Sequence, residues 1–286
     1  MPYNTEADIA TFVNTVWEDA MLVARDNNVM SGLVNGFGDL QGLAVRKNAK
    51  YNGTAAFNQI SETDDLTSQS FTPVVDQTLT PYEYGSQFFI TDSRLETDIF
   101  AVRQDAAQEF GAAYGQKIDT FLAGMFSSLT GGTVGAAGTN MSWANFFAAI
   151  TKMRRALAPR PWVAVLTPEQ WHCLGTAIAP GVTVTNSPFI QDEFIRQFYV
   201  GGVSGVDIFT TANIATGTSV YGGMFSRNAL ALDIRRPLRI EPERDASLRG
   251  FELNASSVFA YGVWRPQYGI AINTAGTAPE IGRAHV

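Results

Sequence analysis

The first 27 residues carry apolar side chains at helical spacing. Thr5-Glu6-Ala7-Asp8 has the pattern of a capping box, and apolar residues then recur three or four positions apart over residues 9–24. This pattern predicts an amphipathic helix that ends near Asn27-Asn28. Its apolar face packs either on the core of its own subunit or, as an arm, on a neighbouring copy, and the pattern alone leaves both open.

The strongest helical periodicity starts near residue 98. Apolar residues recur every three or four positions, which predicts one helix over residues 98–128 with a length on the order of 45 Å. Gly111 and Gly115 fall inside it, and each costs about 1 kcal/mol relative to alanine in a helix interior. We therefore expect another backbone to cross the helix closely at these two glycines.

The remaining apolar runs predict a mixed α+β fold. Ser142 is the expected cap of a helix over residues 143–157 that ends before Pro159, and residues 162–166 are typical of a short buried strand. Thr167-Pro168-Glu169 opens another helix, with proline at its first position. Five further segments have the composition of strands between glycines and prolines, namely 206–211, 219–224, 229–234, 251–260 and 269–273.

Between Arg46 and about Asp92 the chain is rich in Thr, Ser, Gln, Asn and Asp. Its β-prone runs are short, at residues 54–60, 71–79 and 86–91. Together these runs predict an extended, polar β-hairpin with too few large apolar residues to bury a core of its own. A long polar hairpin in an otherwise apolar chain suggests contact with another molecule.

The composition indicates either an unusually large core or a surface that is covered in part by partner subunits. Hydrophobic residues make up 45% of the 286 residues and charged residues only 16%, against about 25% in an average soluble domain. Obligate oligomers have such a deficit because subunit contacts replace polar surface. The formal net charge of −7 argues against general nucleic-acid binding, which depends on clustered Lys and Arg, but suits the lining of a container.

Targeting and redox features also narrow the class of protein. Glu6, Asp8, Glu18 and Asp19 stand where a signal peptide would need basic and then uncharged apolar residues. No apolar run reaches about 18 residues, so we expect no membrane partner. The single cysteine, Cys173, excludes an internal disulfide framework and a multi-cysteine zinc site.

Candidate catalytic residues are few. His172 is adjacent to Cys173, but neighbouring side chains on a helix point about 100° apart and do not face each other. The glycines at 36–42 miss the spacing of a dinucleotide-binding loop, and the carboxylates of residues 61–65 lack the ligand spacing of a calcium loop. We therefore predict a protein that is not an enzyme and has no catalytic residues, cofactor or metal site.

The densest charged stretch, residues 235–249, mixes both signs. It is either a solvated strand face or a site of ion pairing between subunits, and mixed sign argues against a nucleic-acid groove. Five of its residues are candidates for contacts between subunits: Arg235, Arg236, Glu241, Glu243 and Arg244.

The order of these segments resembles that of the tailed-phage major capsid proteins of the Hong Kong 97 type. The resemblance is carried by Thr80-Pro81-Tyr82-Glu83-Tyr84-Gly85-Ser86, by Ile90-Thr91-Asp92 before the long helix, by Lys117-Ile118-Asp119 within it, and by residues 163–174 and 222–273. No one of these motifs is specific by itself. Their order along nearly the whole chain carries the resemblance.

The resemblance implies an α+β fold of the Hong Kong 97 type with five parts. These are an N-terminal arm (1–45), an extended β-hairpin loop (46–94), a peripheral domain with a long spine helix (95–130 and 236–275), an axial domain (131–235) and a tail (276–286). The last six residues of the tail resemble a translated sequencing-library adapter. We leave the tail out of the expected fold.

The resemblance also implies a function. It is that of a major capsid protein that self-assembles, as hexamers and pentamers, into the icosahedral shell around phage DNA, with contact to the DNA on the inner face without sequence specificity. We expect a separate scaffolding protein, because only about 45 residues precede the loop, and assembly in the cytoplasm of the host bacterium. Cross-linking between subunits is not predicted, because nothing in the sequence identifies an asparagine and a glutamate that would match Lys47 or Lys50. Further contact candidates are Trp17 in the arm, Lys47, Lys50 and Phe57 in the loop, and Tyr82 after it.

Two alternatives stay open. An encapsulin-like compartment of the same fold would enclose cargo enzymes in place of DNA, and co-purification of DNA or of an enzyme distinguishes the two. A hydrolase or a lectin-like binding domain would instead be a monomer or a small oligomer in solution.

Overall fold

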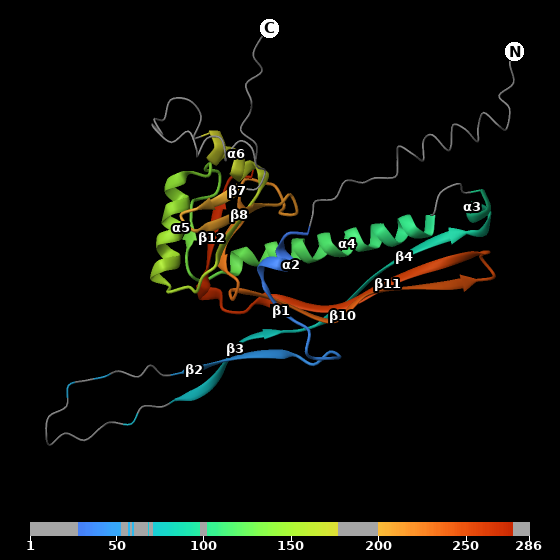
Figure 1. The fold of residues 1–286 in the computed structure, drawn as a ribbon, viewed down its shortest axis with the longest axis horizontal. Coiled ribbons are helices and arrows are strands. Elements are labelled where there is room, and N and C mark those ends of the chain that lie inside the picture. The colour runs from blue at the N-terminus through green and yellow to red at the C-terminus, as the bar shows by residue number, and fades with distance from the viewer. Residues whose placement is uncertain are drawn as a thin grey trace, which may run out of the picture.

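A computed structural model describes residues 28–52, 71–97, 102–176 and 200–276, together with Phe57, Gln59 and Ser68. The helix expected in the first 27 residues, most of the strand expected at 54–60, the acidic cluster at 61–65 and the tail after Gly276 lie outside this part of the chain. The described residues form three β-sheets with helices packed on them (Figure 1). The expected α+β class is confirmed.

The largest sheet has six strands and forms the centre of a compact body. Its order is β5 (Thr133–Val134), β12 (Gly269–Thr274), β9 (Val220–Ser226), β6 (Trp162–Leu166), β8 (Val206–Thr210) and β7 (Val200–Val203). β6 is parallel to β8 and antiparallel to β9, which in turn is antiparallel to β12. The four expected strands in this region are confirmed, and the short β5 and β7 are additional.

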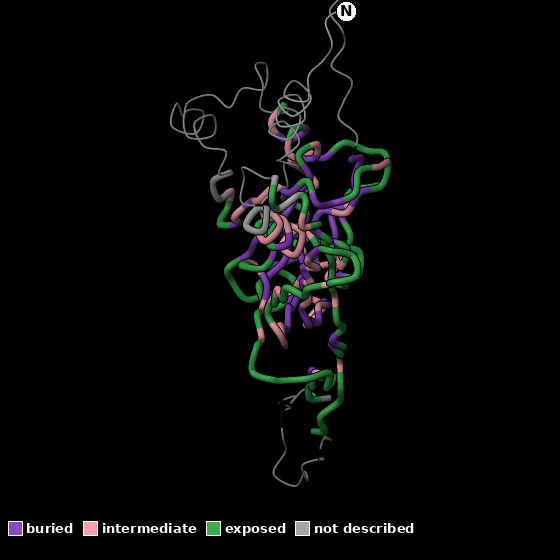
Figure 2. The backbone as a smooth tube through the Cα atoms, turned by 90° about the vertical axis from the view of Figure 1, so that its right-hand side faces the viewer, coloured by how far each residue is buried: buried purple, intermediate pink, exposed green. Residues whose placement is uncertain are grey.

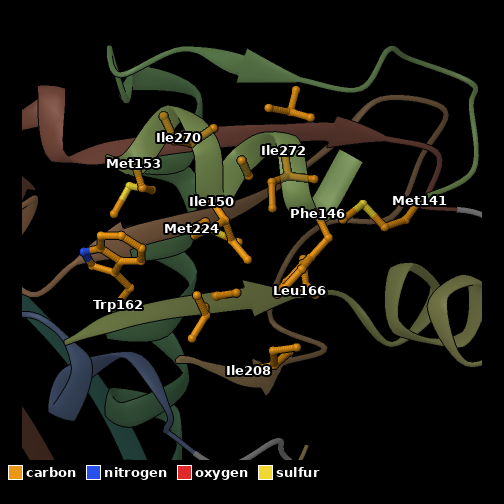
Figure 3. Packing of buried hydrophobic residues seen from close by; sticks show 14 of the residues in the cluster. Met141, Phe146, Ile150, Met153, Trp162, Leu166, Ile208, Met224, Ile270 and Ile272 are labelled. Atoms are coloured by element: carbon orange, nitrogen blue, oxygen red, sulfur yellow. The ribbon is translucent and has the colours of Figure 1, made fainter. Parts of the chain in front are cut away.

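Two helices, α5 (Trp143–Arg155) and α6 (Pro168–Thr176), cover one face of the six-stranded sheet. Both expected helix starts are confirmed. Ser142 Oγ accepts a hydrogen bond from the N–H of Asn145 at 3.3 Å, and Pro168 begins α6. Large apolar side chains from the helices and the sheet interlock between them, among them Phe146, Ile150, Met153, Leu166, Met224 and Ile270 (Figure 3).

The opposite face of the six-stranded sheet is also covered. The short 3-10 helix η1 (Met125–Ser128) brings the ring of Phe126 to 5.7 Å from that of Phe225. All five residues of β6 are buried because helices lie on both sides of it. This explains its unbroken run of apolar residues, in which no polar position alternates with the apolar ones.

The second sheet is long and narrow. Its order is β1 (Asn35–Phe37), β10 (Leu230–Asp245), β11 (Gly250–Val263) and β4 (Tyr82–Thr91). β10 and β11 form a hairpin that extends away from the compact body, and β4 runs along its other side (Figure 1). The strands expected at 229–234 and 251–260 are confirmed, and β10 is longer than expected because the charged residues after Ile234 continue it.

The long helix α4 (Val102–Gly124) lies along the second sheet, and η1 continues it to Ser128 (Figure 1). The helix expected over 98–128 is thus confirmed from Val102 onward. At 1.5 Å per residue its 23 residues extend about 35 Å. A short helix, α3 (Asp92–Thr97), precedes it directly after β4.

Aromatic rings join α4 to the second sheet. Phe121 of α4 stacks on Tyr261 of β11 with ring centres 4.5 Å apart. Tyr84 of β4 stacks on Phe259 of β11 at 4.5 Å and lies 5.3 Å from Phe121. Each such pair contributes about 0.5–1.5 kcal/mol beyond the area it buries, so this cluster fixes how the helix lies on the sheet.

The chain crosses α4 at one of the two glycines where a close approach is expected. A Cβ atom on Gly115 would lie 3.4 Å from the Cβ of Asn28, so the expected crossing is confirmed there. At Gly111 the expectation is wrong for the described part of the chain, because none of its atoms would lie within 4 Å of an added Cβ.

A buried carboxylate holds this crossing segment on α4. Asp119 is fully buried, and it accepts hydrogen bonds from the backbone N–H groups of Val29 at 2.8 Å and Met30 at 3.0 Å, where the short helix α2 (Met30–Leu33) begins. The side-chain amide of Asn213 donates a third bond at 3.4 Å. Asp119 therefore connects the segment before β1, the long helix and the loop after β8.

The third sheet is the two-stranded hairpin of β2 (Arg46–Asn52) and β3 (Thr72–Leu79). It confirms the base of the hairpin expected over 46–92, but β4 does not belong to it. All ten residues of β4 pair with β11, so the extended hairpin is shorter than expected and Thr80-Pro81 separates strands of two different sheets. Figure 2 shows that buried residues gather in the body of the molecule, whereas most of the hairpin at the lower end is exposed.

An ion cluster anchors the base of this hairpin to the second sheet. Asp233 of β10 is fully buried, and its Oδ2 accepts a hydrogen bond from Arg46 Nε at 2.7 Å and forms an ion pair with Arg235 at 2.8 Å. Arg46 also pairs with Asp39, and its guanidinium lies 4.4 Å from the centre of the Phe37 ring. Because Arg46 is the first residue of β2, the anchor holds the hairpin where it leaves the body.

The charges of this cluster reinforce one another. Burial by itself would lower the pKa of the Arg46 guanidinium, but its hydrogen bonds to Asp233 and Asp39 outweigh burial and raise that pKa. The hydrogen bond from Arg46 lowers the pKa of Asp39. Arg46 and Asp39 are therefore both charged at neutral pH.

Apolar and polar contacts support the anchor from the other strand. Leu79, the last residue of β3, is buried against Ala231, Ala260 and Trp264. Asn48 of β2 donates a hydrogen bond from Nδ2 to the carbonyl oxygen of Trp264 at 2.6 Å. Both strands of the hairpin are thus fixed at their inner ends.

Replacing Asp233 with Asn tests the anchor. The amide keeps the shape of the side chain but leaves two guanidinium groups without a buried opposite charge, so we expect a loss of roughly 3 kcal/mol in the free energy of unfolding, measured by urea titration. Glu241→Gln is the control, since it breaks an exposed ion pair with Arg239 and should cost less than about 1 kcal/mol. Equal losses for the two variants would contradict the anchoring role.

Replacing Gly111 with Ala tests the open surface of α4. Alanine is about 1 kcal/mol better than glycine in a helix interior, and nothing described opposes the added methyl group. We expect the midpoint of urea unfolding to rise. Gly115→Ala should gain less, because its methyl group meets Asn28. A lower midpoint for Gly111→Ala would show that a neighbour packs at that position.

Candidate assembly surfaces

The hairpin exposes large apolar side chains on both strands. Tyr51 and Phe71 stack with ring centres 4.4 Å apart, although they are 62% and 66% exposed. Val74 and Val75 follow on β3 and are about half exposed, and Phe57, farther along the loop, is fully exposed. Burying one such side chain is worth about 1.5–3 kcal/mol. A partner that covered this group would therefore be held strongly.

Charged candidates flank this apolar group. Lys47 and Lys50 are exposed on β2, and Lys50 Nζ forms an ion pair with Asp76 of β3 at 2.6 Å. Tyr82 is 59% exposed at the start of β4, close in sequence to the hairpin. Trp17 lies outside the described residues. The structure thus places Lys47, Lys50, Phe57 and Tyr82 on or beside one projecting element.

The charged stretch after Ile234 is a strand face, as one of its two interpretations predicts. Each arginine of β10 forms an ion pair within the subunit: Arg235 with Asp233, Arg236 with Glu83, Arg239 with Glu241, and Arg244 with Asp92. Arg235 is buried, so its charge is directed to its own chain. Asp233 and Glu241 belong to β10 itself, whereas Glu83 comes from β4 and Asp92 from the start of α3. The sequence indicates the charges correctly but not which partners they have.

The best-formed of these pairs ties β10 to the start of α3. Arg244 donates from both terminal nitrogens to the two oxygens of Asp92, at 2.7 and 2.8 Å, and its guanidinium lies 4.8 Å from the centre of the Phe251 ring. This hydrogen bonding lowers the pKa of the Asp92 carboxyl. The pair is therefore fully formed at neutral pH and weakens only as acid protonates Asp92.

A carboxylate pair is left on the outer side of the same sheet. Glu243 is exposed on β10 and lies opposite Glu252 of β11. Like charges in this position destabilise a sheet slightly. Gln87 of β4 donates a hydrogen bond to Glu252 at 2.7 Å. Among the charged contact candidates of β10, Glu243 is the one that forms no ion pair within the described residues.

The residues considered for catalysis are not brought together. Cys173 is a free thiol buried in the core beneath α5 and α6, whereas the neighbouring His172 is exposed. Within the described ranges no group of three or more His, Cys, Asp or Glu residues is placed to hold a metal ion. Gly36 is part of strand β1, which pairs in parallel with β10.

No helix in the described part of the chain is long and apolar enough to cross a membrane.

Sequence reasoning missed two residues that organise these surfaces, Asp233 and Asp119. Both are fully buried. Buried carboxylates are rare unless they are paired or hydrogen-bonded. Asp233 interrupts the apolar run 229–234, and this is the signal that could have marked it. Asp119 stands between Ile118 and Thr120, beside Lys117, where the sequence has no comparable run.

A family model supports the resemblance seen in the sequence. The model of the phage capsid protein family matches residues 74–272, which is well over half of the chain. The matched region runs from β3 to β12 and so includes the long helix and nearly all of the two larger sheets. Among curated proteins, none matches the chain.

Solved structures show the same fold. A structure from Mycobacterium phage Che8 matches with a TM-score of 0.73 and 16% identity, over 88% of this chain and 93% of that one. The capsid of the cyanophage P-SCSP1u matches with 0.68 and 16%, over 90% of each chain. The capsid of a native GTA particle matches with 0.68 and 14%, over 89% of this chain and 92% of that one. At such identities the likeness establishes the fold.

The family match extends from β3 to β12, and the structural match covers 88% of the chain. The Hong Kong 97-type fold expected from the sequence is confirmed. The chain belongs to the phage capsid protein family, as a major capsid protein that forms the phage head shell.

Proposed function

We propose that the β2–β3 hairpin is the element with which each subunit holds its neighbours in the shell. The observation that carries this proposal is the contrast between its two ends. The inner end is fixed by the buried Asp233 and by Leu79, while the outer part exposes Tyr51, Phe71 and Val75 to solvent. An element fixed at its base loses little orientational freedom when it binds, so more of the contact energy appears as affinity.

The proposed contacts are between unlike surfaces. The hairpin of one subunit covers a different surface of the next, and such head-to-tail contacts close into rings when the rotation between neighbours allows it. Rings of six and five copies then form the hexamers and pentamers of an icosahedral shell. Lys47, Lys50, Phe57 and Tyr82 are the proposed contact residues on the hairpin side, and Glu243 is the proposed one on β10.

Four candidates change their proposed role in the light of the fold. Arg235, Arg236, Glu241 and Arg244 already form ion pairs within the subunit. We infer that these residues stiffen the second sheet, and that any contact they make with a neighbour is secondary. For Trp17 the proposed contact is that of the N-terminal arm.

The division of the chain into parts also remains a proposal, with two changes. We keep the arm (1–45), the peripheral domain around the spine helix (95–130) and the axial domain (131–235). The extended loop, expected over 46–94, is better ended at Leu79, because β4 pairs with β11 in the second sheet. The returning part of the peripheral domain, 236–275, is better divided, because β12 pairs with β9 and β5 in the six-stranded sheet. We therefore assign β12 to the axial domain and the outer parts of β10 and β11 to the peripheral domain.

We propose that copies of this subunit assemble into a closed particle around phage DNA. Assembly takes place in the cytoplasm of the host bacterium and involves no catalytic step. Membership of the phage capsid family supports DNA as the content, in preference to the cargo enzymes of an encapsulin-like compartment. Contact with the DNA is proposed to be independent of its sequence. A separate scaffolding protein is proposed to assist assembly. The experiment on the loop therefore compares assembly with and without a co-expressed scaffolding protein.

Shortening the loop tests the hairpin proposal. Asn52 and Thr72 pair directly across β2 and β3, so residues 53–71 can be replaced by Asn-Gly, which forms a two-residue turn. We expect a folded subunit whose thermal unfolding midpoint stays near that of the wild type. Electron microscopy should show no shells from this variant, with or without a co-expressed scaffolding protein, under conditions where the wild type forms them.

A variant with residues 53–71 replaced by a Gly/Ser segment of equal length is the matched control. It keeps the reach of the loop but removes Phe57 and Phe71, so we expect it to fail in assembly as well. Normal shells from either variant would refute the hairpin contact. Particles that contain an enzyme in place of DNA would favour the encapsulin-like alternative.

A further inference from the structure

One stretch of this acidic chain contains no acidic residue. Between Asp119 and Glu169 there is no Asp or Glu, although the whole chain has 27 of them. The charged residues in this stretch are all basic, namely Lys152, Arg154, Arg155 and Arg160. A protein with a formal net charge of −7 therefore has a segment of 49 residues (120–168) whose formal charge is +4.

The fold brings these four residues to one end of one helix. Lys152, Arg154 and Arg155 occupy the last turn of α5, and Arg160 follows in the loop before β6. The three arginines are exposed. We call this group the α5 basic patch.

Stabilisation of α5 explains only part of the patch. Cations in the last turn of a helix interact favourably with its dipole, by about 0.3–1 kcal/mol each. The helix dipole thus accounts for one or two of the basic residues in the last turn of α5. It does not account for Arg160, which lies beyond the helix, nor for the absence of any neighbouring carboxylate from the sequence.

The arginines of the patch differ from those of β10 in their partners. All four arginines of β10 are paired with carboxylates. Within the described residues, Arg154, Arg155 and Arg160 form no ion pair. Arg160 lies over the ring of Trp162 at 4.8 Å, and Lys152 donates to the carbonyl oxygen of Thr133 at 2.5 Å. No carboxylate of the described residues therefore neutralises the charge of these three arginines.

We propose that the α5 basic patch binds the phosphate backbone of the packaged DNA, which places the α5 face of the six-stranded sheet toward the interior of the shell. This rests on the proposed function, in which the shell encloses DNA. Guanidinium groups bind phosphate oxygens in a bidentate geometry, and phosphates carry no sequence information. The patch would thus give sequence-independent contact to a chain whose overall charge opposes it.

The patch is repeated in every subunit of the shell. This repetition favours a polyanion, and not an acidic patch on a neighbouring subunit, as the partner of the α5 basic patch. Each hexamer or pentamer would present five or six copies around one axis, and these positive groups repel one another. Duplex DNA has one negative charge per roughly 1.7 Å of its axis, so it can neutralise many copies in succession. Few contacts per subunit then suffice, because the shell holds many subunits.

The test measures binding of unassembled subunits to a fluorescent duplex of mixed sequence at several salt concentrations. The logarithm of the binding constant should fall with the logarithm of salt with a slope of about −0.9 per phosphate contact, thus near −3 for three arginines. The triple variant Arg154→Gln, Arg155→Gln and Arg160→Gln should lose nearly all of this slope and bind on the order of tenfold or more weakly at low salt.

Two controls make the result specific. The variant Arg236→Gln, Arg239→Gln and Arg244→Gln removes the same number of charges from β10, where each is already paired, and should leave the slope unchanged. Single variants of Arg154 and Arg155 should each reduce the slope by about 1, which keeps the test valid if the triple variant fails to fold. Equal slopes for the patch variants and the wild type would overturn the proposal.

Assembly distinguishes a DNA contact from a subunit contact. Leu157 lies within the patch, is 85% exposed and has a φ of 52°, a conformation that asparagine tolerates better. We expect Leu157→Asn and the triple patch variant both to form shells, with less DNA only in the triple variant. If both prevented assembly, the surface would be a protein contact and the proposal would be wrong, while the shell function would stand. Absence of shells from the wild type would count against the proposed function itself.

Discussion

The buried carboxylate of Asp233 is the interaction on which the position of the hairpin against the second sheet depends. It lies on β10, which with β11 reaches from the compact body to the far end of the long sheet, and it binds Arg46, the first residue of the hairpin. A buried charge is costly unless it is paired, so the hairpin cannot leave this position without exposing or stranding an ion. The same constraint applies to Asp119, which ties the segment before β1 to α4. The projecting parts are therefore held by buried polar contacts, whereas the compact body is held by apolar packing.

The elements that the sequence predicted well are those whose pattern is set locally. β6 and α5 follow from an unbroken apolar run, a serine cap and helical spacing, and α4 follows from a long periodic stripe. The elements that it did not predict depend on distant partners. Arg46 and Asp233 are 187 residues apart, and β4 has the composition of a hairpin strand but pairs with β11. The arginines of β10 could be recognised as ion-pairing residues, but the sequence did not show that Arg236 and Arg244 pair within their own subunit, because Glu83 and Asp92 are distant in the chain.

Charge is divided between two regions in a way that composition conceals. On β10 the cations are matched one by one by carboxylates, and this leaves a stiff, nearly neutral strand with a residual acidic pair, Glu243 and Glu252. On α5 the cations have no carboxylate partner among the residues that the structure describes. The net charge of the chain describes neither region. An argument from net charge alone would exclude contact with a polyanion, although the C-terminal end of α5 is suited to make one. Whether a region can contact a polyanion depends on which of its cations are paired with carboxylates. The overall pI does not show this.

In the proposed function the hairpin holds a neighbour, and it has to do so without pairing with every exposed strand it meets. Its apolar side chains are flanked by Lys47 and Lys50 on β2 and by Pro73 and Asp76 on β3, which are the residue types that discourage addition of a further strand at a sheet edge. Pro73 has no N–H to donate, and a charge beside the edge must stay solvated. Strand addition at either edge of the hairpin is thus disfavoured, while the Tyr51–Phe71 stack remains open to side-chain packing. A contact made by side chains requires a surface of matching shape, which a sister subunit presents at a fixed position and an unrelated strand does not. The hairpin can therefore be both adhesive and selective.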